Sequence, residues 1–156
     1  MKLLSILLLA LTFGITSCCH HHHNSYNTTD YVIIGSTGGF AGTSIGLTDY
    51  YQITGGHVMK DVSVRTHSIP DDNGGFNFNI SCPTKYDSVK DLLISIPTAM
   101  LQDSIASYGQ SFPDAGYTEV RASINGTYHH WYFQYDQSIS PAAIKAYSDK
   151  FQLLFQ

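Results

Sequence analysis

Residues 117–135 constrain the fold of this 156-residue chain more than any other segment. Asn125 and Gly126 stand at its centre, and both residue types tolerate the positive φ that a two-residue type I′ turn requires. Such a turn sets residue 124 opposite residue 127, and this fixes the register of both strands. The register divides the hairpin into an apolar side and a polar side. The apolar side holds Val120, Ala122, Ile124, Trp131 and Phe133, and the other side holds Glu119, Arg121, His130 and Tyr132.

Further strands and helices are expected on both sides of this hairpin in the sequence. Runs rich in β-branched and aromatic residues predict strands, and apolar residues at spacings of three and four predict helices. Gly55-Gly56 indicates a hairpin turn. Glu is a good helix former, and the chain contains only one, Glu119, which argues against a mostly helical protein. The predicted strands are 31–34, 43–54, 57–65 and 76–82, and the predicted helices are 88–96, 99–107 and 141–154. This order predicts a single α+β domain over residues 31–156, with an antiparallel sheet and helices packed on one face.

The first 17 residues have the pattern of a targeting segment. Lys2 is followed by an apolar stretch that is shorter than the roughly 20 residues of a membrane-spanning helix. Ile15-Thr16-Ser17-Cys18 then resembles the lipobox of bacterial lipoproteins. The resemblance implies cleavage after residue 17, diacylglycerol on the Cys18 thiol, further acylation such as palmitate, and a lipidated polar tether over residues 18–30. Two or more acyl chains give stable membrane anchoring.

Another origin for this segment stays open. It is an ordinary signal peptide that is cleaved near Ser17, which would leave Cys18 and Cys19 as plain residues. The tripeptides that begin at Asn27, Asn79 and Asn125 match glycosylation sequons and would suit a secreted eukaryotic protein. Four histidines, His20 through His23, follow the cysteines. We expect them to be a solvated part of the tether, because adjacent side chains of an extended chain point in opposite directions and form no closed metal site.

Glycine-rich residues 35–42 and the segments after them carry a family resemblance. Together with Leu92-Leu93-Ile94-Ser95-Ile96-Pro97, Phe112-Pro113-Asp114, Trp131 and Pro141, they are similar to a family of small bacterial lipoproteins of unknown function. The early Gly-Gly-Phe-Ala-Gly segment and the closing hairpin and helix also resemble emfourin-type inhibitors of thermolysin-like metalloproteases. This second resemblance implies an interaction loop formed by Gly38, Gly39, Phe40 and Gly42.

Other kinds of site are not supported by the residue pattern. No Lys or Arg cluster that would bind nucleic acid is present, and the glycine-rich segment has no Lys before Thr43-Ser44, as a phosphate-binding loop would require. His57, His67, His129 and His130 show no metal-ligand spacing, and we expect His129 to be partly buried and His130 to lie on the surface. Cys82 is expected to be a buried, inert thiol, although a disulfide with Cys19 stays open. The sequence therefore predicts no cofactor, no metal site and no catalytic residues.

These observations favour a lipid-anchored, non-enzymatic binding or structural module in a bacterial cell envelope. Its expected partners are the membrane, through Cys18, and a protein of the envelope; the periplasmic and outer-surface sides both stay open. The rich Tyr content, eleven residues, favours a contact surface, although half-exposed strands also use Tyr. The alternative function is inhibition of a thermolysin-like metalloprotease through the loop around Phe40.

Overall fold

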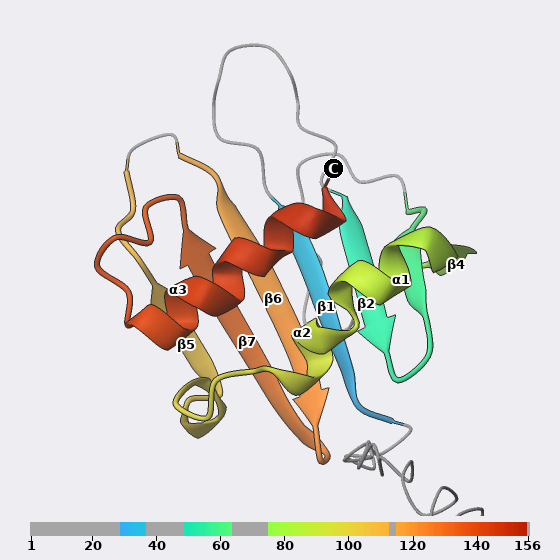
Figure 1. Ribbon diagram of the computed structural model, residues 1–156, viewed down its shortest axis with the longest axis horizontal. Coiled ribbons are helices and arrows are strands. Elements are labelled where there is room, and N and C mark those ends of the chain that lie inside the picture. The colour runs from blue at the N-terminus through green and yellow to red at the C-terminus, as the bar shows by residue number, and fades with distance from the viewer. Residues whose placement is uncertain (1–28, 37–48, 64–74, 113–114, 156) are drawn as a thin grey trace, which may run out of the picture.

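A computed structural model describes residues 29–36, 49–63, 75–112 and 115–155 (Figure 1). Within these residues seven strands form one sheet, in the order β4-β3-β2-β1-β6-β7-β5. All neighbouring strands run antiparallel except β5 and β7, which are parallel. The strands are β1 Tyr31–Ser36, β2 Tyr50–Thr54, β3 Val58–Asp61, β4 Phe78–Ser81, β5 Ile105–Tyr108, β6 Tyr117–Ile124 and β7 Thr127–Gln134.

The helical elements of the described residues are short. They are α1 Pro83–Val89, α2 Asp91–Ile94, the 3-10 turn η1 Met100–Gln102, α3 Ala142–Asp149 and the 3-10 turn η2 Lys150–Leu154. Figure 1 shows α1, α2 and α3 in front of the sheet, with α3 crossing the strands obliquely. The α+β class expected from the sequence is therefore confirmed for one compact unit.

The Asn125-Gly126 hairpin is confirmed in turn and register. Asn125 has φ 50 and Gly126 has φ 77, as a type I′ turn requires. Ile124 pairs with Thr127, and Val120 pairs with Trp131. The Gly55-Gly56 turn is confirmed as well, because β2 and β3 pair on either side of it.

The helix predicted over residues 99–107 is wrong. Its first residues form only the 3-10 turn η1, and Ile105–Tyr108 form the edge strand β5 beside β7. Ala106 and Tyr108 pack against the core, whereas Ile105 and Ser107 point to the other side of the sheet. Pairing of this segment with β7 therefore overrides its local helical spacing. The sheet is consequently mixed and not antiparallel throughout.

Three boundaries also differ from the sequence prediction. Gly35 and Ser36, predicted as part of a turn, belong to β1. The strand predicted over 76–82 is shorter, and as an edge strand it leaves Ile80 52% exposed. The single helix predicted over 88–96 is instead two short helices, α1 and α2, which meet at Lys90, and the first begins already at Pro83, because proline fits the first helical position, where no backbone N–H is needed.

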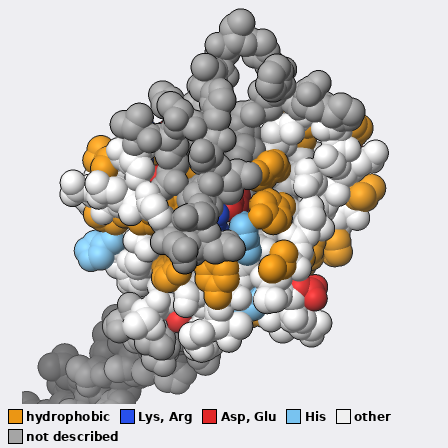
Figure 2. All heavy atoms as spheres, turned by 180° about the vertical axis from the view of Figure 1, so that it is seen from behind, with side chains coloured by type: hydrophobic (Ala, Val, Ile, Leu, Met, Phe, Trp, Pro, Cys, Tyr) orange, Lys and Arg blue, Asp and Glu red, His pale blue; other side chains and the backbone are white. Residues whose placement is uncertain are grey.

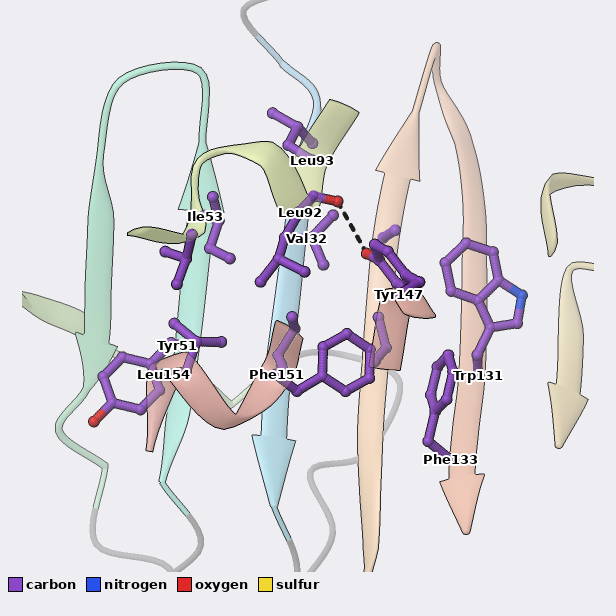
Figure 3. Close-up of a cluster of buried hydrophobic side chains, with 14 of the residues drawn as sticks. Val32, Tyr51, Ile53, Leu92, Leu93, Trp131, Phe133, Tyr147, Phe151 and Leu154 are labelled. Atoms are coloured by element: carbon purple, nitrogen blue, oxygen red, sulfur yellow. Dashed lines mark hydrogen bonds between the residues drawn. The ribbon is translucent and has the colours of Figure 1, made fainter. Parts of the chain in front are cut away.

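The hydrophobic core lies between the sheet and the helices (Figure 3). Strand residues such as Val32, Ile53 and Trp131 are buried there against Phe151 and Leu154 of η2. The apolar stripe predicted for the last helix is confirmed, since all four of its members are buried: Ile144, Tyr147, Phe151 and Leu154. Cys82 has a free thiol. Its side chain is partly buried and packs against this core.

Candidate functional site

The candidate site lies on the face of the sheet opposite the core. Successive side chains of a strand point to opposite faces. Since Val120 and Ala122 belong to the core, Glu119 and Arg121 of β6 point to the other face. Arg121 pairs with His130 of β7, so that imidazole shares this face. Figure 2 shows the face from behind, where a basic and an acidic side chain are visible between hydrophobic ones.

Glu119 is the centre of a buried polar cluster on this face. We define the polar cluster as Tyr50, Glu119, Arg121 and His130. The Tyr50 hydroxyl donates to Glu119 Oε2 at 2.5 Å, and Arg121 donates from Nε and a terminal guanidinium nitrogen to Oε1, each at 2.8 Å. His130 Nε2 lies 2.5 Å from the same Oε1. Because an ionised carboxylate only accepts hydrogen bonds, this geometry assigns the proton to Nε2.

The cluster keeps Glu119 ionised although the side chain is 0% exposed. Burial alone would raise the pKa of this carboxyl, because it disfavours the charged form. The hydrogen bonds from His130 and Tyr50 and the charge of Arg121 outweigh burial and hold the pKa of Glu119 below its ordinary value. The negative charge is therefore matched inside the fold.

Gly35 makes the contact between Tyr50 and Glu119 possible. It pairs with Tyr50 on one side and with Glu119 on the other, so the phenol must pass over β1 to reach the carboxylate. A Cβ atom on Gly35 would lie 2.1 Å from Cε1 of the Tyr50 ring. Burial, followed by the hydrogen bond to Glu119, raises the pKa of Tyr50, so this side chain stays a neutral donor.

Aromatic rings enclose the cluster on the β4 side. The Arg121 guanidinium lies 5.5 Å from the centroid of the Phe76 ring, a cation–π distance. Phe76 meets the Tyr50 ring edge-on at 5.0 Å and stacks on Phe78 at 5.1 Å. These rings help explain why Arg121 is only 2% exposed.

Tyrosines flank the cluster on the β7 side. The rings of His130 and Tyr132 lie 4.5 Å apart, and Tyr117 contacts Tyr132 at 5.5 Å. Tyr128, two residues before His130, lies 6.5 Å from that imidazole and is 42% exposed. We call these rings together the aromatic face: Phe76, Phe78, Tyr117, Tyr128 and Tyr132.

The buried carboxylate of Glu119 organises the polar cluster. Glu119 accepts from three side chains and is fully enclosed, so it serves to fix the orientations of Tyr50, Arg121 and His130. His130 Nδ1 lies 3.5 Å from the Tyr132 hydroxyl, at the long limit for a hydrogen bond. The cluster thus holds a preformed aromatic surface whose charges are compensated underneath.

The residues that the sequence singled out have different positions. Cys18, the histidines 20–23, His67 and the loop residues Gly38, Gly39, Phe40 and Gly42 lie outside the described residues. His129 is buried as a stacking partner of Trp131 at 5.0 Å. The expectation of a surface His130 is wrong, since it is 6% exposed because it is drawn into the contact with Glu119. In the described ranges, no group of three or more His, Cys, Asp or Glu is placed to hold a metal ion.

Sequence reasoning placed half of the site and missed the other half. The hairpin register correctly put Glu119, Arg121 and His130 on one side. Tyr50 and Phe76 were missed, because they reach the cluster from strands far away in the sequence. The sequence did contain one signal for this site. Glu119 and Arg121 carry opposite charges and stand two residues apart, on the side of the strand away from the core.

Comparisons with protein-family models, with curated proteins and with solved structures found no match to this chain. Among the described residues, no helix is long and apolar enough to cross a membrane.

Proposed function

We propose that the chain is a lipid-anchored, non-enzymatic binding or structural module of a bacterial cell envelope. The lipobox-like Ile15-Thr16-Ser17-Cys18 supports an anchor at Cys18, with residues 1–17 as its signal peptide. Residues 18–30 would form the tether that precedes the folded domain. The domain would then be held close to the periplasmic or the outer side of a membrane.

The observation that carries the binding role is the aromatic face. The helices α1, α2 and α3 lie over the core side of the sheet (Figure 1), and we infer that the opposite side, which carries the aromatic face, takes part in binding. Aromatic side chains are enriched in binding surfaces because they supply large contact area at low conformational entropy cost. Beneath them, the polar cluster fixes Tyr50, Arg121 and His130 through a single carboxylate, so the surface is formed before a partner binds.

The anchor is tested by Cys18→Ser, with Cys19→Ser as the matched control. Loss of the thiol at position 18 removes the acyl attachment point, so Cys18→Ser should move the protein from the membrane fraction to the soluble fraction. Cys19→Ser should leave it on the membrane, and its intact mass should include acyl groups. A mature chain of unmodified mass, or membrane retention of both variants, would refute the anchor at Cys18.

The binding role is tested separately by Tyr128→Ala in the Cys18→Ser chain, which has no anchor, with Tyr135→Ala as the control. Tyr128 belongs to the aromatic face, whereas Tyr135 is 79% exposed and follows the end of β7. Retention on isolated envelope material should fall for Tyr128→Ala in the absence of the lipid anchor and stay unchanged for Tyr135→Ala. Equal retention of both variants would count against a role for the aromatic face.

A further inference from the structure

We propose that the edge strand β5 pairs with β5 of a second copy of this chain, so that two sheets join into one. This self-association goes beyond the proposed function, since it involves neither Cys18 nor the aromatic face. β5 is the last strand of the seven-stranded sheet, and within the part of the chain that the structure describes it pairs with β7 alone (Figure 1). A further strand adds to a sheet at such an edge, through backbone groups that point outward.

The hydrogen bonds to β7 determine which backbone groups of β5 point outward. Ile105 pairs with His130 in the parallel register, and the His130 N–H donates to the Ser104 carbonyl oxygen at 2.7 Å. In a parallel ladder the His130 carbonyl accepts from Ala106, so the backbone of Ser104 and Ala106 faces β7. By alternation, the N–H and C=O groups of Ile105 and Ser107 face away from β7. None of the described residues forms a hydrogen bond with these four groups.

β5 lacks the features that prevent most sheet edges from pairing with another chain. Natural edge strands carry Lys, Pro or a β-bulge, which discourage such pairing. The four residues Ile105–Tyr108 include no charged residue and no Pro, and their register with β7 is regular. Ile105 is also 73% exposed. The opposite edge differs, because the register of β3 with β4 shifts between Lys60 and Asp61. Of the two edges, β5 is therefore the better suited to accept a strand.

The outward groups of β5 are complementary to themselves, which favours a second copy as the occupant. In an antiparallel pair with a two-fold axis at Ala106, Ile105 of each copy lies opposite Ser107 of the other. Both positions are hydrogen-bonded pairs, so the outward groups of the two strands are satisfied by four backbone hydrogen bonds. The two Ile105 side chains become diagonal neighbours on one face. Because β5 is already extended in each copy, the pairing does not require a free peptide to become ordered.

The size of this contact indicates a weak and reversible dimer. Strands of four residues bury less surface than the roughly 1,200 Å² of stable complexes. The proposed lipid anchor would confine the chains to one membrane and so raise the effective concentration of β5. A covalent trap is the most sensitive way to detect such a dimer in solution.

The test traps the pair with a disulfide in a full chain that carries Cys18→Ser, Cys19→Ser and Cys82→Ala. Ala106→Cys places the thiols of two copies at a non-hydrogen-bonded pair, whose Cα atoms lie about 4.5 Å apart, within the range of a disulfide. A mild oxidant should therefore give disulfide-linked dimers. Ser107→Cys is the control, since its Cα atoms would lie roughly 9 Å apart, which is too far. Ser107 is more exposed than Ala106, so random collisions would favour the control.

A second variant and a second measurement check the location of the contact. Ile105→Lys, added to Ala106→Cys, should slow dimer formation about tenfold, because two ammonium groups become neighbours across the axis. The variant should still unfold cooperatively, since Ile105 is exposed. Sedimentation velocity of the Cys18→Ser chain needs no new thiol. Its average mass should rise toward that of a dimer as the concentration approaches about 1 mM, and Ile105→Lys should oppose that rise.

Three results would overturn the proposal. Equal trapping at positions 106 and 107 would refute the register. Absence of trapped dimers at position 106, or an average mass that stays that of the monomer over the whole concentration range, would refute self-association through β5. Dimers that Ile105→Lys leaves unchanged would mean that the contact lies elsewhere. None of these results bears on the anchor at Cys18 or on the aromatic face, which have their own tests.

Discussion

Gly35 shows how a missing side chain can determine the chemistry of a sheet face. The Tyr50 ring lies across β1 at this position and carries its hydroxyl to Glu119 on the far side. Any other residue would place a Cβ atom inside that ring. The glycine is therefore required by close approach, since no positive φ is recorded for it.

Gly35→Ala should destabilise the protein by about 1–3 kcal/mol, because an added methyl must displace a buried ring. Urea unfolding followed by the fluorescence of Trp131, the single Trp of the chain, measures the loss. Gly55→Ala is the control, since nothing lies within 4 Å of its Cβ position. That change should stay within about 0.5 kcal/mol of the wild type. Equal effects of both substitutions would contradict the role assigned to Gly35.

Glu119 should make the stability depend on pH in the acidic range. Its pKa is lower in the folded protein than in the unfolded chain, so its contribution is present above the ordinary Glu pKa, about 4.3, and is lost as pH falls through the folded value. At pH 7, Glu119→Gln should cost about 3–5 kcal/mol, because it removes the buried carboxylate charge that pairs with Arg121.

The comparison that checks this is the difference in unfolding free energy between wild type and Glu119→Gln at pH 7 and at pH 3. The difference should shrink at pH 3, because Glu119 of the unfolded chain is protonated below its ordinary pKa whereas the pKa of the folded carboxyl is lower. Asp149→Asn is a control, because Asp149 forms an exposed helix pair with Lys145 and should change stability by less than about 1 kcal/mol. A difference for Glu119→Gln that is the same at both pH values would argue against an ionised Glu119 in the fold.

At the scale of elements, local sequence determines the β6–β7 hairpin but not β5. The Asn125-Gly126 turn and eight-residue flanks with matching apolar sides agree with each other, so the register could be predicted residue by residue. Residues 105–108 have no such local signal. Their strand exists because β7 offers a parallel partner and the core accepts Ala106 and Tyr108, which are contacts that no short window of sequence contains.

The helix α3 is linked to α2 by one buried hydrogen bond, drawn in Figure 3. The Tyr147 hydroxyl donates to the Leu92 carbonyl oxygen at 3.0 Å, and burial raises the pKa of this phenol. Tyr147→Phe should therefore cost about 1 kcal/mol through the lost hydrogen bond. Phe151→Ala should cost about 3–5 kcal/mol, because it leaves a cavity in the core.

Urea unfolding of both variants measures these two costs. If Tyr147→Phe destabilised the protein as much as Phe151→Ala, the role assigned to the Tyr147 hydroxyl, a single hydrogen bond between α3 and α2, would be wrong. Tyr86→Phe serves as the control, since Tyr86 is only partly buried at the margin of the same core.

At the scale of the whole molecule, the order of strands explains why the candidate site was only half predictable. β1 lies between β2 and β6, which are separated by more than 60 residues in the chain. Sequence pattern gives the side of each strand that faces the core, but not which strands are neighbours. Glu119, Arg121 and His130 were placed together because one hairpin contains them, whereas Tyr50 and Phe76 required the complete sheet.

The central proposal is that the domain is anchored through Cys18 and presents its aromatic face to the envelope. A photo-crosslinking phenylalanine analogue at position 128, compared with the same analogue at position 135, tests it most directly in the lipid-anchored protein in its native membrane. The account predicts crosslinks to envelope material from position 128 and a background signal from position 135. Equal crosslinking from both positions, or none from position 128, would contradict it.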